Sequence, residues 1–455
     1  MTDSDERSRK TPRRLGAWES GVRVSSGGGK PSFAFRPGEV IVHADARDEA
    51  RKVAGNVETE TEIVASLFLL KGQFDPVVVS RKLRAEGFDA HVNYVLVAAP
   101  MTFAHPATIP HPATIPHPAT IPHPATIPHP ATIPHPFGYG YGGGGCCCCD
   151  CSKEDSKTST PTGPRVNTAE ETPAEPRLNR TGKGPTKSRV VVLDSGLDPK
   201  SSGGLLQPQI TAQAKSAWGP SEPGSTDNLD AHDDNGDKWL DPVAGHGTFI
   251  ASIIARLAPQ ATVEVGKVLQ PTGEGNDADL AYRIDALLSD PPAVLCIASS
   301  CYTDDDEPPA ALAVAITAIQ TAGTLVVCAA GNEMTSRVSW PSALPDVIAV
   351  GALDGSGPAP FTNYGWWVNA CAPGTDIVGN FYSGVDDPDD GNPNKSEFEG
   401  WAKWSGTSFA APIVAGMLAR EMDLYGISGR EAVRRVIDDP RLFRIPGLGT
   451  VVNAH

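Results

Sequence analysis

Four polar residues in the second half of the chain have the types that nucleophilic acyl transfer requires. Ser408 lies in WSGTSFAAPIVAG, His246 lies between two glycines in GHGTFIASIIARLAP, and Asp194 follows the apolar run VVVL. Asn332 ends the run LVVCAAGN. A serine nucleophile needs a base, a carboxylate that orients the base, and hydrogen-bond donors for the oxyanion. These four side chains, with the main-chain N–H of Ser408 as a second oxyanion donor, would fill those roles.

Ser408 taken alone fits two interpretations. The run from Phe409 to Leu418 predicts a buried helix, and SGTS before it suits a turn and a helix N-cap. Ser408 is then either part of the cap or a nucleophile at the positive end of the helix dipole. The base, the acid and the amide elsewhere in the chain favour the nucleophile.

The segments that carry these residues predict an α/β fold with a doubly wound, mostly parallel sheet. SRVVVLDSG starts with an apolar run without alternation, which is typical of a buried parallel strand. TVEVGKVL, AVLCIASS, TLVVCAAGN and VIAVGAL have the same character, and the helical patterns DADLAYRIDALLSD and PAALAVAITAIQTAG lie between them. Ligands of such sheets bind at the carboxyl ends of the strands, where Asp194 and Asn332 are expected.

The motifs VVVLDSGLDP, GHGTFIASIIARLAP, AAGNE and SGTSFAAPIVAG, in this order, resemble the subtilisin-like serine peptidases (the subtilase, or peptidase S8, family) over residues 188–455. The resemblance implies a serine endopeptidase with protein or peptide substrates. It implies a catalytic triad of Asp194, His246 and Ser408, with Asn332 in the oxyanion hole.

Four positions that are not catalytic depart from the family's usual residues. Each stands where the family usually has a smaller or more polar residue or a Met, so we expect a change in the shape of the pocket. The four are Phe249, Ser252, Phe409 and Ile413.

The segment CIASSC stands at the place of the family's substrate-binding strand. The resemblance implies that Ser299, Ser300 and Cys301 pair through their backbone with an extended substrate. The acidic loop TDDDEP follows directly, from Asp304 to Glu307. It is either a solvated surface loop or a source of preference for Lys or Arg on the substrate.

The first 100 residues divide into a tail, 1–32, expected to be disordered, and a small α/β domain, 33–100. EVIVHA, EIVASLFLLKG and HVNYVLVAAP predict three strands, with helices from Asp45 to Gly55 and from Asp75 to Gly87. This order suggests a ferredoxin-like unit. It resembles the prodomain (inhibitor I9-like) of subtilases, which implies a zymogen with an intramolecular inhibitor; an unrelated small domain is the alternative.

Residues 101–187 predict a low-complexity linker. HPATIP repeats five times from His105 to Pro134, and two prolines in six residues favour polyproline II. That helix would place successive histidines roughly 19 Å apart, which suits a spacer better than a metal site. CCCCDC, from Cys146 to Cys151, leaves metal binding, lipidation, disulfides and undirected low-complexity sequence open.

The charge of −16 excludes some classes of partner. Counted from the sequence, residues 189–455 carry 16 basic and 34 acidic side chains, which argues against a nucleic-acid partner. No apolar run is long enough to span a membrane, and the charged N-terminus lacks the usual form of a secretory signal. A cytoplasmic place is the default expectation, with non-standard export left open.

The remaining cysteines and the cofactors complete these expectations. Cys296, Cys301, Cys328 and Cys371 lie in or beside apolar runs, which favours buried free thiols over disulfides. Catalysis of this kind requires no cofactor, and we assign no metal ligands. DDNGD, residues 233–237, only loosely resembles a calcium loop, so a structural calcium ion stays an unsupported alternative.

Two other functions compete with the zymogen of an active peptidase. The chain is otherwise a latent peptidase-fold scaffold that uses its His and Cys tracts to capture a metal or a partner. Regulated proteolysis, in which a partner releases the prodomain, is a third reading.

Overall fold

The computed structural model describes residues 22–27, 30–98, 162–166, 187–198, 207–212, 228–233, 240–355, 357–386 and 397–453. The HPATIP repeats, the CCCCDC cluster and most of DDNGD lie outside these residues. Of the expected linker, 101–187, the described part is a short strand, β6 (Thr162–Val166), and Lys187.

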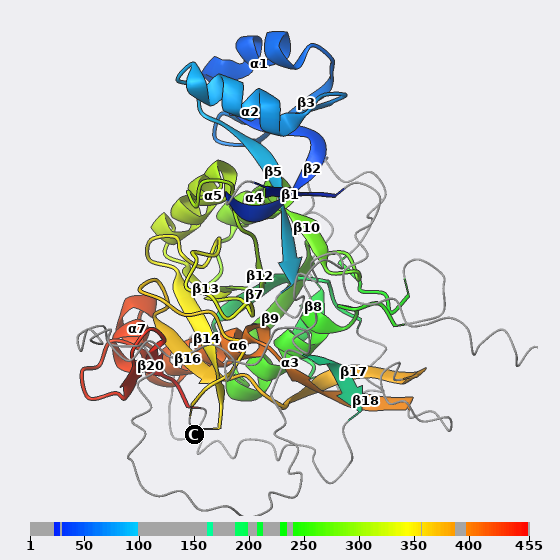
Figure 1. The fold of residues 1–455 in the computed structure, drawn as a ribbon. Helices are drawn as coiled ribbons and strands as arrows, with labels where there is room; N and C mark the ends of the chain where they lie inside the picture. The colour runs from blue at the N-terminus through cyan, green and yellow to red at the C-terminus, as the bar shows by residue number, and fades with distance from the viewer. Residues whose placement is uncertain are drawn as a thin grey trace, which may run out of the picture.

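A ten-stranded, mostly parallel sheet forms the centre of the larger unit (Figure 1). Its strand order is β19-β20-β16-β14-β13-β11-β7-β9-β8, with β15 paired to β14. The strands are β7 (Arg189–Asp194), β8 (Ile210–Ala212), β9 (Thr262–Lys267), β11 (Val294–Ile297), β13 (Leu325–Ala329), β14 (Ile348–Asp354), β15 (Gly357–Pro358), β16 (Ala370–Pro373), β19 (Arg444–Ile445) and β20 (Gly449–Val451). β15 and β19 pair antiparallel with their neighbours, and every other pairing is parallel.

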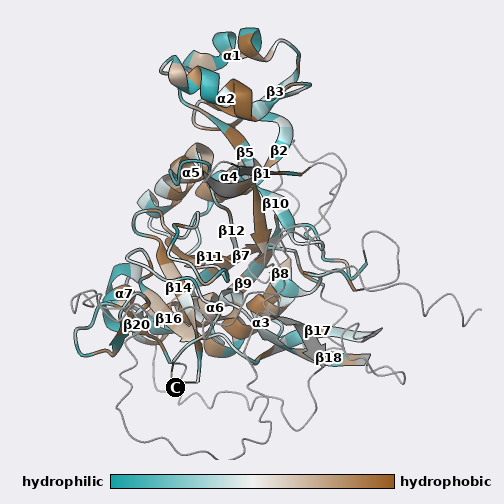
Figure 2. Ribbon diagram, in the orientation of Figure 1, coloured by the Kyte–Doolittle hydropathy of each residue, from teal (hydrophilic) through white to brown (hydrophobic). Residues whose placement is uncertain are grey.

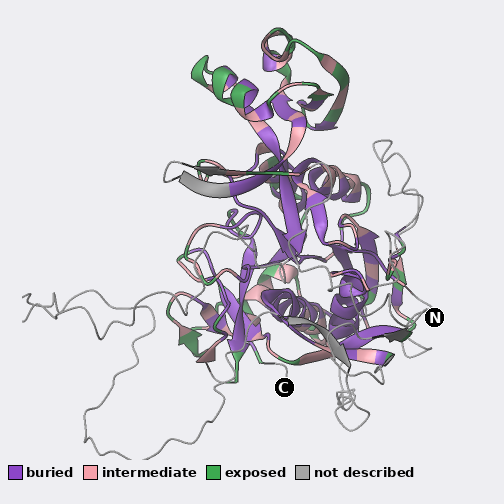
Figure 3. Ribbon diagram, turned by 45° about the vertical axis from the view of Figure 1, so that its right-hand side comes forward, coloured by how far each residue is buried: buried purple, intermediate pink, exposed green. Residues whose placement is uncertain are grey.

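Helices cover both faces of this sheet, so the predicted doubly wound α/β fold is confirmed. Val190 and Val192 of β7 belong to the hydrophobic cluster that contains α3 (His246–Leu257) and α6 (Thr407–Tyr425). Val191 and Leu193 belong to the cluster that contains α4 (Asp277–Ala286) and α5 (Ala310–Thr321). Alternate side chains of a strand point to opposite faces, and here both faces are apolar and buried (Figures 2 and 3).

A smaller sheet leads directly into α6. β17 (Ile377–Asp386) pairs antiparallel with β18 (Glu397–Ser405), and β6 pairs with the other edge of β18. α6 follows β18 after Gly406 and ends before Gly426, and α7 (Gly429–Val436) packs against it. The strand β18 therefore fixes the position of the first turn of α6.

The N-terminal unit is built on four antiparallel strands of a seven-stranded sheet, with two helices on one face. It consists of β2 (Lys30–His43), a short 3₁₀ turn (Ala44–Ala46), α1 (Arg47–Ala54), β3 (Val57–Val64), β4 (Leu67–Gly72), α2 (Pro76–Ala85) and β5 (Ala90–Ala98). The strand order β5-β2-β4-β3 is that of a ferredoxin-like unit. As predicted, α2 starts with Pro76 after an Asp75 cap that accepts the N–H groups of Val77 and Val78.

Two expectations for this region were wrong in detail. EIVASLFLLKG forms parts of two strands, because Ala65 and Ser66 turn the chain with φ values of 27° and 69°. The tail expected to be disordered contains β1 (Arg23–Gly27), which pairs with β2, and β2 itself starts at Lys30. The sheet of the N-terminal unit is therefore longer than the sequence indicated.

The N-terminal unit packs on the larger unit through β5 and through the face of its sheet (Figure 1). β10 (Glu274–Asn276) and β12 (Ser299–Ser300) both pair antiparallel with β5. On the face opposite α1 and α2, Ile63 and Leu69 join a hydrophobic cluster with Leu280 and Ile284 of α4. The two units thus share one core and one sheet.

Candidate active site

Asp194 and His246 form a hydrogen-bonded pair with no exposed surface. Nδ1 of His246 lies 2.7 Å from Oδ1 of Asp194, and both side chains are 0% exposed. A carboxylate only accepts hydrogen bonds, so the proton of a neutral imidazole sits on Nδ1. Nε2 is then left as the basic nitrogen.

Two glycines let the segments of this pair approach each other. Gly196 has φ +106°, which turns the chain away after Asp194. A Cβ on Gly247 would lie 2.4 Å from the carbonyl oxygen of Gly196. Any larger residue at position 247 would push α3, and His246 with it, away from the end of β7.

Asp230 connects the same two segments through hydrogen bonds. Its Oδ2 accepts the hydroxyl of Ser195 at 2.8 Å and the N–H of Gly245 at 2.7 Å. Ser195 Oγ in turn accepts the N–H of Gly247 at 3.1 Å. Burial raises the pKa of Asp230 to about 7. Asp230 therefore holds the neighbours of Asp194 and of His246 in register.

Ser408 is the second residue of α6, inside the helix, so it does not serve as a cap. The cap position is Gly406, and the N–H of Thr407 donates instead to Oδ1 of Asn332 at 2.9 Å. Ser408 is 0% exposed, and its hydroxyl donates to the carbonyl of Ala298 at 3.4 Å. The serine therefore sits at the positive end of α6 with a weakly held hydroxyl.

Four buried polar atoms of the predicted site residues have no hydrogen-bond partner among the described residues. They are Nε2 of His246, Nδ2 of Asn332, Oγ of Ser299 and Oδ2 of Asp194. A buried polar group without a hydrogen-bond partner destabilises the folded state, so such groups often mark a functional site. The residues on either side of Ser408 contact two of these side chains: Thr407 bonds to Asn332, and Phe409 packs on His246. An open base nitrogen and an open amide N–H₂ so placed can accept a serine proton and stabilise an oxyanion.

Aromatic rings surround His246, and two of them are the departures from the family pattern. The ring of His246 lies 5.2 Å from Trp404 and 5.3 Å from Phe409, edge to face in both contacts. Phe249 packs on Phe409 at 4.7 Å and on Trp404 at 5.7 Å. Of the other two departures, Ser252 donates to the carbonyl of Phe249 at 2.7 Å, and Ile413 is buried in the same core.

Two of the three residues predicted to pair with substrate lie on a strand edge that is occupied by β5, and their role in substrate binding stays a prediction. Ser299 and Ser300 lie in β12 and pair with Ala98 and Val97 of β5. Cys301 does not take part, because its N–H and C=O bond with Trp340 at 2.8 Å and 3.0 Å. Cys296, Cys301, Cys328 and Cys371 are buried free thiols, as predicted.

The sequence analysis missed two residues of the site. Trp404 lies four residues before Ser408, and its ring contacts could not be inferred from the motif. Asp230 lies in an acidic stretch, NLDAHDDNGD, where nothing distinguishes it from its neighbours.

Within the part of the chain that the structure covers, no group of three His, Cys, Asp or Glu side chains could hold a metal ion, and no helix is long and apolar enough to cross a membrane.

A separate cavity of about 410 Å³ lies near the amino ends of β7 and β9. Lys187, Gln209, Thr262 and Asp423 are among the residues that line it. Asp194 and Asn332 lie at the carboxyl ends of their strands, so this cavity is at the other end of the sheet. It has no part in the site described above.

The model of the subtilase family, peptidase S8, matches residues 186–439, which is more than half of the chain. The chain belongs to the subtilase family. The matched region includes Asp194, His246, Asn332 and Ser408 and covers most of the larger unit, so this subtilase has the fold that the sequence predicted.

Curated relatives of this subtilase match about half of the chain. It is 32% identical over 220 residues to a thermophilic serine proteinase of Bacillus sp. (strain AK1), covering 45% of this chain and 48% of the relative. It is 27% identical over 241 residues to the M-protease of Shouchella clausii (strain KSM-K16), covering 51% and 53%. The match thus spans about half the length of each of these relatives.

Solved structures similar to this subtilase include a cold-adapted subtilisin-like serine proteinase and a lanthipeptide protease. The first has a TM-score of 0.44 at 20% identity and covers 59% of this chain and 88% of that chain. The second has a TM-score of 0.47 at 24% identity and covers 59% and 85%.

Proposed function

We propose that this chain is a serine endopeptidase made as a zymogen. Ser408 is the nucleophile, His246 the general base, Asp194 the residue that orients the base, and Asn332 an oxyanion donor. The observation that carries the proposal is the buried Asp194–His246 hydrogen bond of 2.7 Å, which leaves Nε2 of His246 open.

The reaction proceeds in two acyl-transfer steps. Ser408 Oγ attacks the carbonyl carbon of the scissile bond while its proton moves to Nε2 of His246. The oxyanion that forms accepts hydrogen bonds from Nδ2 of Asn332 and from the N–H of Ser408. The imidazolium gives its proton to the leaving amine as the C–N bond breaks, and water then attacks the acyl-enzyme by the same route.

Asp194 stabilises the imidazolium that forms on His246. Its Oδ1 also accepts the N–H of Ser195 at 2.8 Å, which adds a fixed donor to the carboxylate. Trp404 and Phe409 close the site around His246 and exclude water from it. A dry site strengthens each of these electrostatic interactions.

The N-terminal unit is proposed as the intramolecular inhibitor of this peptidase. Its last strand, β5, pairs with β12 on one side and with β10 on the other. An extended substrate bound by strand addition would pair with the same backbone groups. Ala98 lies opposite Ser299, and Ser408 donates to the neighbouring Ala298, so β5 ends beside the nucleophile.

Polar contacts with β10 and the start of α4 strengthen this inhibitory arrangement. The N–H of Tyr94 donates to Oδ1 of Asp277 at 2.8 Å. Asn93 donates to Asn276 at 3.3 Å, and Arg36 lies 3.8 Å from Glu274. A substrate has to displace all of these contacts before it reaches the strand edge.

A fluorophosphonate probe tests the nucleophile directly. We expect intact-mass spectrometry of the matured wild-type chain to show one adduct, which Ser408→Ala abolishes and the exposed Ser289→Ala retains. Loss of an N-terminal fragment in the wild type but not in Ser408→Ala would support maturation by the chain itself. An adduct of equal yield on Ser408→Ala would overturn the assignment of the nucleophile.

The competing scaffold function rests on the His and Cys tracts, which lie outside the described residues. Deletion of residues 101–152 separates the two functions. Under our proposal the deleted chain still reacts with the probe and cleaves peptides. A scaffold would lose its function with the tracts.

A further inference from the structure

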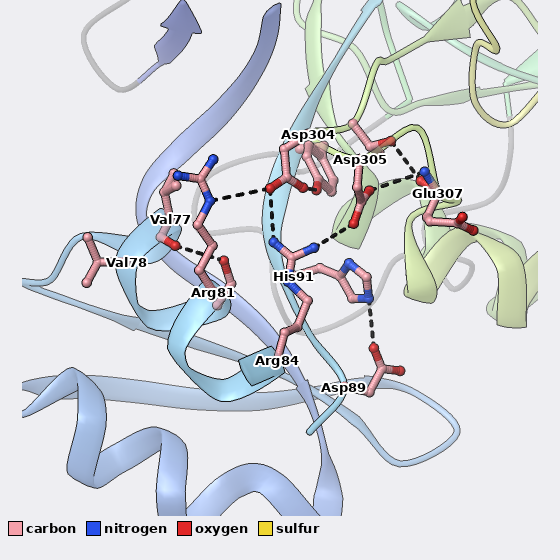
Figure 4. Close-up of polar contacts among 12 residues, drawn as sticks. Val77, Val78, Arg81, Arg84, Asp89, His91, Asp304, Asp305 and Glu307 are labelled. Atoms are coloured by element: carbon pink, nitrogen blue, oxygen red, sulfur yellow. Dashed lines mark hydrogen bonds and ion pairs between the residues drawn. The ribbon is translucent and has the colours of Figure 1, made fainter. Parts of the chain in front are cut away.

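The acidic loop after β12 holds the N-terminal unit through one carboxylate, which two hydrogen-bond donors and one further arginine share (Figure 4). Oδ2 of Asp304 accepts Nη2 of Arg84 at 2.9 Å, and Nε of Arg81 lies 3.7 Å from the same oxygen. Oδ1 of Asp304 accepts the hydroxyl of Tyr94 at 2.8 Å. Asp305 adds a second contact, with Arg84 Nη1 at 2.6 Å from its Oδ2.

Asp304 is built into the surface beside the cleft. Its side chain is 9% exposed. Burial opposes its charge, but hydrogen bonds from Arg84 and Tyr94 outweigh burial and hold the pKa of its carboxyl below the usual value. Among the described residues, each side-chain partner of Asp304 comes from the N-terminal unit. When that unit leaves, the carboxylate loses these partners, and its charge is open to a cationic group that takes their place.

Tyr94 reaches Asp304 from a strand that lies where we expect an extended substrate to bind. Tyr94 belongs to β5 and lies one residue before the stretch Val95–Ala98 that pairs with β10 and β12. Its side chain is 0% exposed and reaches Asp304 from the strand itself. A chain bound in place of β5 would therefore direct the side chain at the Tyr94 position toward Asp304.

We propose that Asp304, with Asp305 beside it, is an upstream subsite that selects substrates with arginine or lysine at the position of Tyr94, four residues before the residue that pairs with Ser299. This inference rests on the proposed peptidase function. A guanidinium can donate to both oxygens of a carboxylate, and it replaces the charge that Arg84 and Arg81 remove when they leave. An ammonium supplies the charge without the forked geometry, and a phenol supplies one donor without charge.

Matched peptides test this subsite on protein that is expressed as the full chain and then matured. A set that differs only at this position, with Arg, Lys, Tyr, Ala or Glu, is compared by kcat/KM, and neighbouring positions are varied in parallel. We expect the order Arg, Lys, Tyr, Ala, Glu, with Arg over Ala by about tenfold, the range of a partly buried charge pair. The preference should decrease as the salt concentration rises.

Variants of the loop test whether Asp304 itself or the overall negative charge of the loop causes the preference. Asp304→Asn should reduce the Arg-to-Ala ratio to below about twofold, whereas Asp304→Glu retains part of it. Asp305→Asn, at the more exposed neighbour, should reduce the ratio less. Asp306→Asn is the matched control, because Asp306 pairs with Arg337 of the same unit at 2.7 Å, and it should leave the ratio unchanged.

The outcomes are distinguishable from failure of the peptidase proposal. Cleavage of all peptides at equal rates, or an unchanged ratio in Asp304→Asn, overturns the subsite and leaves the peptidase intact. If the protein cleaves no peptide and takes no fluorophosphonate, the proposed function fails and the subsite fails with it. A ratio has no dependence on the concentration of active enzyme, so incomplete maturation does not affect the comparison.

Discussion

The hydroxyl of Ser195, the residue directly after Asp194 in the chain, donates to the carboxylate of Asp230 at 2.8 Å. The same carboxylate accepts the N–H of Gly245, one residue before His246. A single buried side chain thus fixes both partners of the Asp194–His246 pair. This relationship gives a testable dependence of stability on pH.

Asp230→Asn should remove the part of the pH dependence of the free energy of unfolding that Asp230 causes between about pH 4 and pH 7. Burial raises the pKa of Asp230 from 3.8 to about 7, so in this window the folded state keeps a proton that the unfolded state releases. The contribution of Asp230 to stability therefore falls as the pH rises, and the variant lacks this fall.

Denaturant titrations in the Ser408→Ala background, which prevents self-digestion, measure this difference. Asp290→Asn serves as the control, because the Asp290 side chain is 83% exposed. Parallel pH profiles for the wild type and Asp230→Asn would contradict the assignment of the proton to Asp230.

Asp194→Asn should lower kcat by a factor on the order of 10⁴, as the loss of the carboxylate does in other serine peptidases. The amide can donate to Nδ1 and so favours the wrong tautomer of His246. KM should change little, since Asp194 is buried away from the bound substrate. The measurement is steady-state kinetics normalised to probe-reactive sites, and a loss of less than tenfold would speak against the orienting role.

Asn332 has two separable roles, which two substitutions can resolve. Its Nδ2 is open to the oxyanion, and its Oδ1 accepts the N–H of Thr407 at 2.9 Å. Asn332→Ala and Asn332→Asp both remove the donor, so each should lower kcat by about 10²–10³.

Only Asn332→Ala also removes the acceptor at the start of α6, so only this variant should lose thermal stability through that contact. Thermal unfolding in the Ser408→Ala background measures it. Normal kcat in either variant would exclude Asn332 from the oxyanion hole.

Arg84→Ala should weaken the hold of the N-terminal unit on the cleft. Arg84 bonds to both Asp304 and Asp305, whereas Arg81 makes one ion pair at 3.7 Å. We expect the uncut chain to react with the fluorophosphonate about tenfold faster in Arg84→Ala and less so in Arg81→Ala. High salt should reduce the difference, and equal rates in all three proteins would show that the loop does not hold the inhibitor.

The parts of this molecule that sequence reasoning could predict are those set by local pattern. The apolar runs before Asp194 and Asn332 are buried strands because no alternation is left for a solvent face. Ser408 and His246 could be predicted because their motifs place them at helix starts.

The rest depends on contacts between distant segments. EIVASLFLLKG has no Gly, Pro or Asn at the place of its turn, Ala65 and Ser66, so the hairpin was missed. Cys301 pairs with Trp340, and Arg84 meets Asp304, across separations that no local pattern records. The sequence predicted that the acidic loop is either solvated or in contact with substrate. In the structure it contacts the N-terminal unit.

β6 has a consequence for how strongly the inhibitor is held. Thr162 lies opposite Ser405, three residues before Ser408, and Ala98, at the end of β5, lies opposite Ser299. The covalent tether between the two anchored strands is therefore residues 99–161 alone. A tether converts rebinding into an intramolecular event, with an effective concentration of up to about millimolar for short linkers and less for longer ones. One cut within it removes that advantage without changing a single contact, so β5 then competes with substrate on its own affinity.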